Sequence, residues 1–257
     1  MTDTTPPRRP HALVTGGGTG IGAAVAARLD TDGFAVTLLG RRAHALEATA
    51  ETLAQAQTVT ADVTDADAVA RAFATAREGF GPIDVLVNNA GAAKTAPFHR
   101  IAEADWQSML DVNLSGVFHC MQAALADMRD AGWGRIVNIA STAGLKGYPY
   151  VAGYCAAKHG VIGLTRAVAL ELAREPITVN AVCPGYTDTE LVAGALDTIT
   201  EKTGRSREEA LAEFVKVNPQ HRLVQPGEVA ETVAWLCRPA AAAVTGQAIS
   251  VSGGEVM

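Results

Sequence analysis

The sequence predicts an α/β protein built on a doubly wound parallel sheet with helices on both faces. Short apolar runs alternate with longer helical stretches from one end of the chain to the other. Most of these runs are apolar throughout, as expected for strands that are buried on both faces of a parallel sheet. The length of 257 residues suits one large domain better than two, because α/β folds often exceed about 200 residues as a single unit.

Each candidate strand except the last is followed by a candidate helix or by a loop that leads to one. The predicted strands are Ala12–Val14, Ala35–Leu39, Thr58–Thr60, Val85–Val87, Arg135–Ala140, Thr178–Val182 and Ala248–Val251. The predicted helices are residues 21–30, 43–55, 65–78, 103–130, 153–174 and 226–237. Connections of this length between strands favour helical crossovers within one parallel sheet.

The composition excludes several classes of protein. Hydrophobic residues make up 48% of the chain and charged residues 19%, which excludes a disordered chain, a collagen and a coiled coil. The net charge of −6, without a run rich in Lys and Arg, argues against nucleic-acid binding. No apolar run approaches the roughly 20 residues of a membrane helix, so no membrane association is expected.

The cysteines and the N-terminus bear on the cellular setting and on the domain limits. The four cysteines are far apart and form no CxxC pair, so neither a disulfide scaffold nor a zinc ribbon is predicted. This usage of cysteine fits a reducing, cytoplasmic environment.

Residues 1–10 are rich in proline and predict a disordered N-terminal arm, which leaves residues 11–257 as a single domain.

A glycine-rich turn follows the first strand and predicts a nucleotide site. Glycines at such a turn allow a tight bend, close approach of the backbone to a pyrophosphate, and close packing of helix on strand. The N-terminus of the next helix would supply free N–H groups to the phosphates. A glycine turn without ligand is the alternative, and its place after the first buried strand disfavours that alternative. The turn reads Thr15-Gly16-Gly17-Gly18-Thr19-Gly20-Ile21-Gly22.

The ends of the second and third strands bear on the choice of cofactor. Gly40-Arg41-Arg42 follows the second strand, where NAD-binding proteins usually carry an acid for the ribose hydroxyls. Arginine suits a phosphate instead, which favours the 2′-phosphate of NADP. A solvated start of the next helix is the alternative for both arginines. Asp62, beside Val63, is a candidate acceptor for the adenine amino group or a helix-start residue.

Further motifs appear along the chain in a fixed order. Together with the glycine turn, this order resembles the short-chain dehydrogenase/reductase family over about residues 10–254. The resemblance implies one Rossmann-type domain with seven parallel strands, a nicotinamide cofactor and a homotetramer. The second half is similar to 3-oxoacyl-thioester reductases and aromatic-polyketide ketoreductases. The motifs are Gly16-x-x-x-Gly20-Ile21-Gly22, Asn88-Asn89-Ala90-Gly91, Asn113, Ser141, Tyr154-x-x-x-Lys158 and Pro184-Gly185.

The resemblance implies that Asn113, Ser141, Tyr154 and Lys158 form a catalytic tetrad. Tyr154 and Lys158 are four residues apart, so on a helix they share a face. The ordinary pKa of tyrosine, near 10, is too high for a base at neutral pH, and a neighbouring cation would lower it. Tyr154 would then exchange a proton with the substrate oxygen, which Ser141 holds.

Other positions are assigned from the same resemblance. Lys158 would also bind the nicotinamide ribose, and Asn113 would anchor a water that links Lys158 to solvent. Asn89-Ala90-Gly91 would lie beside the cofactor. After Pro184-Gly185, Thr189 fits the position of a threonine that meets the carboxamide, whereas Thr187 replaces an apolar residue. The cofactor site therefore comprises Gly16, Gly18, Thr19, Gly20, Ile21, Gly22, Arg41, Arg42, Asp62, Val63, Asn89, Ala90, Gly91, Tyr154, Lys158, Pro184, Gly185, Thr187 and Thr189.

Residues 186–225 interrupt the strand–helix pattern and are more polar than the rest. This segment predicts a helical insertion over the active site that closes as a substrate lid, and a peripheral helical hairpin is the alternative. Leu191, Leu211 and Phe214 would then form the substrate wall, together with Ser141 and Tyr154.

The sequence therefore predicts an oxidoreductase that transfers a hydride between NADP(H), preferred over NAD(H), and a carbonyl or secondary alcohol. Reduction of a ketone or a 3-oxoacyl thioester is the main hypothesis. The alternatives are a dehydrogenase that oxidises a 3-hydroxyacyl compound or another secondary alcohol, and an inactive Rossmann-fold binding protein. No metal is expected, because the cofactor would carry the chemistry.

Overall fold

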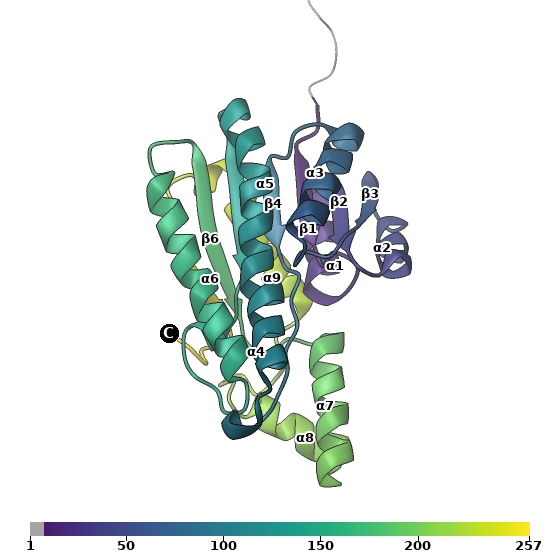
Figure 1. Cartoon of the computed structure of the whole chain (residues 1–257), viewed down its shortest axis with the longest axis vertical. Helices are drawn as coiled ribbons and strands as arrows, with labels where there is room; N and C mark the ends of the chain where they lie inside the picture. The colour runs from purple at the N-terminus through teal and green to yellow at the C-terminus, as the bar shows by residue number, and fades with distance from the viewer. Residues whose placement is uncertain (1–7) are drawn as a thin grey trace, which may run out of the picture.

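The computed structural model describes residues 8–257 and contains one seven-stranded sheet (Figure 1). All six strand pairs are parallel, and the strand order is β3-β2-β1-β4-β5-β6-β7. The predicted fold class is confirmed. The strands are β1 (His11–Thr15), β2 (Ala35–Gly40), β3 (Ala56–Thr60), β4 (Val85–Asn88), β5 (Gly134–Ile139), β6 (Ile177–Pro184) and β7 (Ala248–Val251).

Helices occupy most of the connections between strands. The α-helices are α1 (Gly20–Thr31), α2 (Ala43–Ala50), α3 (Ala66–Phe80), α4 (Glu103–Leu110), α5 (Gly116–Ala131), α6 (Ala152–Glu171), α7 (Glu190–Thr203), α8 (Arg207–Val215) and α9 (Pro226–Cys237). Short helical turns are η1 (Phe98–Arg100), η2 (Asp111–Ser115), η3 (Thr142–Gly144) and η4 (Pro239–Ala241).

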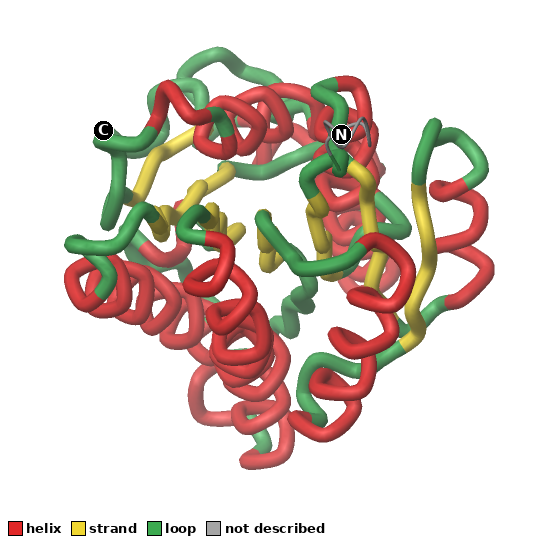
Figure 2. Tube along the Cα trace, turned by 90° about the horizontal axis from the view of Figure 1, so that it is seen from above, coloured by secondary structure: helices red, strands yellow, loops and turns green. Residues whose placement is uncertain are grey.

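The sheet lies between two layers of helices, as the view in Figure 2 shows. Helices α3, α5 and α6 pack on one face, and α1, α2 and α9 pack on the other. Neighbouring strand residues point to opposite faces, so Leu13 belongs to the first core and Val14 to the second. Both side chains are fully buried, which explains why the strands read as continuous apolar runs.

Strand β1 has β2 on one side and β4 on the other. Strands β2 and β3 are therefore added on one side of β1, and strands β4 to β7 on the other side. At such a point, the two neighbouring connections leave toward opposite faces and a crevice opens at the carboxyl ends of the strands. We call this side of the sheet the carboxyl edge and the opposite side the amino edge.

The predicted helix over residues 103–130 is helical throughout but contains a π turn. Helix α4 ends at Leu110, and a π-helical turn over Asp111–Ser115 precedes α5. In a π turn one extra residue is accommodated, and such turns occur often at functional sites. The periodicity of the sequence did not reveal this π turn.

The insertion over residues 186–225 forms the helices α7 and α8, which lie beyond the carboxyl ends of the strands (Figure 1). Gly204 ends α7 in the left-handed conformation, with φ of +68°. Ser206 and Glu209 then form a capping box that starts α8. A small apolar cluster of Val192, Leu196 and Ala210 joins the two helices.

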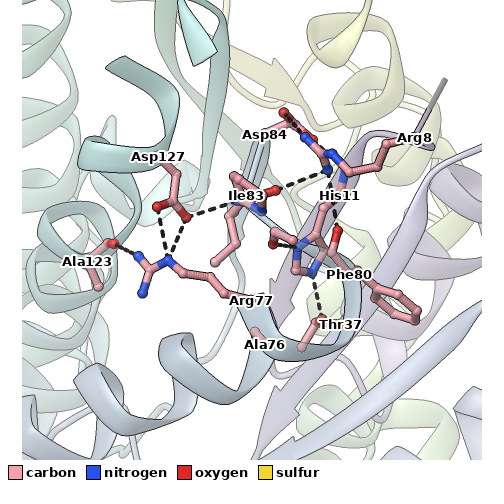
Figure 3. Close-up of polar contacts among 12 residues, drawn as sticks. Arg8, His11, Thr37, Ala76, Arg77, Phe80, Ile83, Asp84, Ala123 and Asp127 are labelled. Atoms are coloured by element: carbon pink, nitrogen blue, oxygen red, sulfur yellow. Dashed lines mark hydrogen bonds and ion pairs between the residues drawn. The ribbon is translucent and has the colours of Figure 1, made fainter. Parts of the chain in front are cut away.

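The predicted disordered arm, residues 1–10, is described only from Arg8 onward. Arg8 lies against the amino edge, where its NH1 is 2.9 Å from Oδ2 of Asp84 (Figure 3). The last residues of the predicted arm are thus fixed to the sheet, while residues 1–7 lie outside the described residues.

Among residues 8–257, no helix is long and apolar enough to cross a membrane.

Candidate active site

A cleft of about 940 Å³ opens at the carboxyl edge of the sheet. The glycine turn, the ends of β2, β4, β5 and β6, and the helices α6 and α7 all contribute to its lining. Every residue that the sequence predicted for the site lines this cleft, except Gly22 and Leu211. The structure therefore brings together residues that are distant along the chain.

The glycine turn adopts a conformation that larger residues would not permit. Gly16 and Gly20 have φ of +64° and +55°, in the left-handed region. Gly22 lies in the first turn of α1, and a Cβ there would lie 2.2 Å from the carbonyl oxygen of Gly16. Gly22 therefore packs against the glycine turn itself and does not line the cleft.

The turn is braced by residues at the end of β4. The Thr15 hydroxyl accepts hydrogen bonds from the backbone N–H of Asn89 and of Ala90, at 2.9 and 3.0 Å. The Asn89 side chain donates back to the carbonyl oxygens of Thr15 and Gly16, both at 3.1 Å. These bonds connect the two strands that flank the crevice, so the asparagine predicted beside the cofactor also holds the glycine turn.

The first turn of α1 is open toward the cleft. Thr19 is the N-cap residue, and within the described chain its side chain makes no capping hydrogen bond to this helix. The free N–H groups and the positive end of the helix dipole can therefore bind an anion. The Thr19 hydroxyl instead accepts a hydrogen bond from NH2 of Arg42, at 3.1 Å.

Both arginines after β2 lie at this end of the cleft and are more than half exposed. Arg41 NH1 lies 3.6 Å from Asp62 Oδ2, so two predicted cofactor residues are adjacent. Arg42 NH2 lies 3.1 Å from Glu190 Oε2, at the start of α7. Such exposed ion pairs contribute little to stability, so both guanidinium groups can rearrange around a phosphate.

The residues Tyr154 and Lys158 stand one turn apart on α6, as the spacing predicted. Lys158 is 3% exposed, and its Nζ donates a hydrogen bond of 2.8 Å to the carbonyl oxygen of Ile139. The same Nζ lies 5.6 Å from the centre of the Tyr154 ring. Ser141 follows β5, and its side chain contacts Tyr154.

Burial dominates the ionisation of this pair. It raises the pKa of Tyr154 to about 12, although the contact with Ser141 opposes the change. Burial also lowers the pKa of Lys158 to about 8. Loss of hydration is the largest influence on the pKa of Tyr154, and Lys158 is not among the groups that shift it. That the lysine lowers the tyrosine pKa therefore stays a prediction. At pH 7 Tyr154 is protonated, and Lys158 is mostly charged.

Asn113 is fully buried within the π turn. Its Nδ2 donates hydrogen bonds to the carbonyl oxygens of Met109 and Ala92, at 3.0 and 2.9 Å. Its Oδ1 faces Gly91, where a Cβ would lie 2.9 Å from this oxygen and 3.8 Å from Lys158 Nζ. The π turn, which packs against α6, thus places the Asn113 side chain beside Gly91 and near Lys158.

Residues after β6 close the other side of the glycine turn. Thr189 packs against Gly20, where a Cβ would lie 3.1 Å from its methyl group. The Thr187 hydroxyl donates a hydrogen bond of 3.0 Å to the carbonyl oxygen of Gly185. Thr187 is 4% exposed, so its hydroxyl is used within the loop in place of the apolar contact that the family pattern implies.

The far end of the cleft is aromatic. Leu191 and Phe214 line it as predicted, but so do Tyr148 and Tyr186, which the sequence analysis missed. Tyr186 packs edge-on against Phe214, with ring centres 4.5 Å apart. Tyr186 directly follows Pro184-Gly185, so its position along the chain was a usable signal. Tyr148 lies in an irregular loop and carries no comparable signal.

Leu211 is a correction to the predicted substrate wall. It packs with Val192, Leu196 and Ala210 between α7 and α8, and not in the cleft. The amphipathic pattern identified an apolar face of α8, but it did not reveal that this face covers α7.

Among residues 8–257, no group of three or more His, Cys, Asp or Glu side chains is arranged to hold a metal ion.

Comparisons with known proteins agree with this geometry. The family profile described as short chain dehydrogenase matches residues 10–199. A Streptomyces coelicolor protein named as a ketoacyl reductase is 43% identical over 249 residues, which cover 95% of each chain. A 3-oxoacyl-[acyl-carrier-protein] reductase of Synechocystis is 42% identical over 252 residues, covering 96% of each chain.

One solved structure extends the similarity to three dimensions. The crystal structure of a variant of actinorhodin polyketide ketoreductase with NADPH superposes with a TM-score of 0.93. Its sequence is 42% identical, and the alignment covers 96% of this chain and 97% of the other.

Proposed function

Because the chain belongs to the short-chain dehydrogenase/reductase family, we propose that it reduces a ketone or a 3-oxoacyl thioester to the hydroxy compound with NADPH. One observation carries this proposal. Tyr154 and Lys158 stand one turn apart on α6 and face the cleft that the glycine turn opens. A proton donor and a nucleotide site thus share one cavity.

The residues present fit a dinucleotide. A Cβ at Gly16 or Gly18 would come within about 3.0 Å of the backbone of Ala90 or Ala45, so only glycine allows this close-packed turn. The first turn of α1 presents free N–H groups. We assign the pyrophosphate to this turn and the nicotinamide to the region between Pro184-Gly185 and Tyr154. When bound, the reduced cofactor supplies the hydride for the carbonyl carbon.

The preference for NADPH rests on Arg41 and Arg42. Both side chains reach solvent beside the glycine turn, and Arg42 already bonds the hydroxyl of Thr19. The end of β2 carries Gly40 where an acid would bind ribose hydroxyls. A 2′-phosphate would find two guanidinium groups there, each able to form charge-assisted hydrogen bonds.

The four tetrad residues have separate roles in this proposal. Tyr154 donates its hydroxyl proton to the carbonyl oxygen, and Ser141 stabilises the negative charge that develops on that oxygen. Lys158 holds its charge next to the tyrosine and favours loss of the proton. Asn113 would anchor a water that links Lys158 to solvent.

The lid prediction is also part of the proposal. Helix α7 lines the cleft with Leu191 and Val192, while Phe214 of α8 reaches the aromatic end. Arg42 connects α7 to the glycine turn through Glu190. We propose that a cofactor phosphate, by recruiting Arg42, changes this contact and lets α7 and α8 close over the substrate.

The predicted homotetramer remains a proposal. Phe118 of α5 and Leu170 of α6 are 42% and 79% exposed, which supports a surface for another copy of the chain on this face. Light scattering after size exclusion would give the mass, and a monomer at micromolar concentration would contradict the assignment.

The assay follows absorbance of the reduced nicotinamide during incubation with NADPH, and separately with NADH. The substrates are aryl ketones, linear ketones and 3-oxoacyl thioesters, each tested also as the alcohol with the oxidised cofactor. We expect reduction with NADPH to give the highest kcat/KM. Faster oxidation of the alcohols would favour the dehydrogenase alternative. If NADPH binds but no substrate turns over, the chain is a binding protein.

A further inference from the structure

A buried carboxylate outside the tetrad lies close to the aromatic end of the cleft. Glu255 is near the C-terminus, and its side chain is 2% exposed. Charged side chains are almost never buried to this extent unless they are paired. The chemistry proposed above does not use Glu255, so its position calls for another role.

Two partners from the loop before α6 hold this carboxylate. Lys146 Nζ lies 3.1 Å from Glu255 Oε1, and the hydroxyl of Tyr148 donates a hydrogen bond to the same oxygen. Lys146 Nζ also lies 5.0 Å from the centre of the Tyr148 ring. The lysine therefore balances the buried charge while the tyrosine hydroxyl is held in one direction.

The chain after β7 is shaped to deliver Glu255 to this position. Gly253 and Gly254 have φ of +63° and +94° and turn the tail back toward the cleft. The carboxylate rests on Gly185, where a Cβ would lie 3.0 Å from Oε2. Larger residues at these glycines would strain the turn or displace the carboxylate, so the tail has a defined path.

Tyr148 itself forms part of the cleft wall. Its hydroxyl lies 2.8 Å from Oγ1 of Thr142, the neighbour of Ser141. Its ring meets Tyr186 edge-on, with centres 6.1 Å apart, and Tyr186 continues to Phe214. Thr142, Tyr148, Tyr186 and Phe214 therefore form a continuous wall from Ser141 to the lid. The C-terminal tail holds Tyr148 in this wall through Glu255.

We propose that Tyr148 is a substrate-specificity residue and that Glu255 is its positioning residue. This inference rests on the proposed reductase function. Without Glu255, the Tyr148 hydroxyl keeps only the uncharged Thr142 hydroxyl as an acceptor. The side chain would then be held less firmly in the loop, and the substrate would lose a preformed wall. The wall acts on substrate binding, while the glycine turn and the arginines that bind the cofactor lie at the other end of the cleft.

The test is a double-mutant cycle with Tyr148→Phe, Glu255→Ala and the combined variant. The probe is the ketone of the assay panel with the highest kcat/KM. We expect each single change to raise KM roughly tenfold, the effect of losing one hydrogen bond to a charged group, with a much smaller change in kcat. The combined variant should be no worse than either single one, because both changes remove the same interaction.

Three further measurements separate positioning from general stability. NADPH affinity should change far less than the KM, because the glycine turn and the arginines proposed to bind the phosphates are untouched. Glu255→Gln, which keeps an acceptor oxygen for Tyr148, should recover most of the KM. Glu175→Ala is the matched control, since Glu175 pairs with Arg129 at 2.9 Å far from the cleft. Additive effects in the double variant, or an unchanged KM in Glu255→Ala, would overturn the inference.

Hydrogen exchange gives a readout that does not depend on turnover. Residues 145–151 of the free protein should exchange faster in Glu255→Ala and in Tyr148→Phe than in the wild type. Unchanged exchange would refute the positioning role even if no ketone is reduced. Faster exchange without any ketone reduction would leave the positioning intact and refute the proposed reductase function.

Discussion

Charged and polar side chains gather at both edges of the sheet, but at the amino edge they bind one another. Asp84 accepts hydrogen bonds from Arg8 at 3.0 Å and from the backbone N–H of His11 at 2.6 Å (Figure 3). Asp127 pairs with Arg77 Nε at 2.8 Å and also accepts from the backbone N–H of Ile83. These contacts tie β1, α3, α5 and the start of β4 together.

His11 is fully buried within the same edge. Its Nδ1 lies 2.8 Å from the carbonyl oxygen of Gly81, and its Nε2 lies 2.7 Å from Oγ1 of Thr37. A neutral ring with a proton on Nδ1 suits both partners, because a carbonyl only accepts and a hydroxyl can donate. Each polar group of the imidazole is thus satisfied within the protein.

The carboxyl edge has the opposite character. Helix α1 starts there without a side-chain cap from Thr19 in the described chain, Arg41 and Arg42 are exposed, and burial raises the pKa of Tyr154 to about 12. Arg41 and Arg42 make only exposed ion pairs, with Asp62 and Glu190, so both guanidinium groups can exchange these partners for a ligand. The comparison teaches that one sheet separates two tasks: polar groups at the amino edge stabilise the fold, and those at the carboxyl edge remain available for binding.

The largest expected effect is on catalysis at the carboxyl edge. Tyr154→Phe removes one hydroxyl, so turnover should fall by about 10²- to 10⁴-fold, the usual contribution of a positioned proton donor. Folding and NADPH affinity should not change, as measured by thermal unfolding and fluorescence titration. If the variant kept more than a tenth of the wild-type rate, the assigned role would be wrong.

The second prediction concerns cofactor choice at the same edge. Gly40→Asp combined with Arg41→Ala should lower the ratio of kcat/KM for NADPH over NADH by roughly 10- to 100-fold, because a charge-assisted contact is replaced by repulsion. The site has room, since a Cβ at Gly40 would lie 3.4 Å from its nearest neighbour, Leu46. Arg71→Ala on α3 is the control. A wild type that already favours NADH would contradict the interpretation of Gly40-Arg41.

The third prediction concerns the amino edge, where a substitution should lower stability and leave activity unchanged. Asp84→Ala leaves Arg8 and the His11 backbone N–H without their acceptor, so the free energy of unfolding should fall by about 2 kcal/mol. Urea denaturation measures this loss. At a temperature where the variant is folded, kcat/KM should stay close to the wild-type value. A parallel loss of activity would show that the two edges are not independent.

The fourth prediction compares the mobility of the two regions. At an NADP concentration ten times Kd, hydrogen exchange over residues 186–225 should slow by about tenfold, because binding stabilises the closed lid. Residues 81–84 at the amino edge should be protected with and without cofactor. Equal and high protection of 186–225 in both states would indicate a rigid hairpin and exclude the lid.

The smallest expected effect is a pH dependence from His11. Burial lowers its pKa below the ordinary 6.5, although Gly81, Asp84 and Asp127 act against this change and Arg8 adds to it. The unfolded state therefore binds the proton first, so His11 contributes stability above pH 6.5 that is lost as the pH falls below this value. Unfolding free energies of the wild type and of His11→Gln, measured from pH 8 to 5, should converge toward acid pH. A constant difference would refute the prediction.

The sequence alone determined the order of the elements, the parallel sheet and most of the cleft. Buried strands are apolar throughout, and the glycine turn requires residues without side chains, so both appear in the sequence as local patterns. The spacing of Tyr154 and Lys158 on one helix is local in the same sense. Such features depend on residues within a few positions of one another.

The tertiary structure decided what depends on packing between distant segments. The π turn at Asn113, the packing of Leu211 between α7 and α8, and the raised pKa of Tyr154 all follow from neighbours that the sequence does not place. The contact of Tyr148 with Glu255 joins residues 107 positions apart. Periodicity shows which face of an element is apolar, but only the folded chain determines what covers that face and how much water is excluded from it.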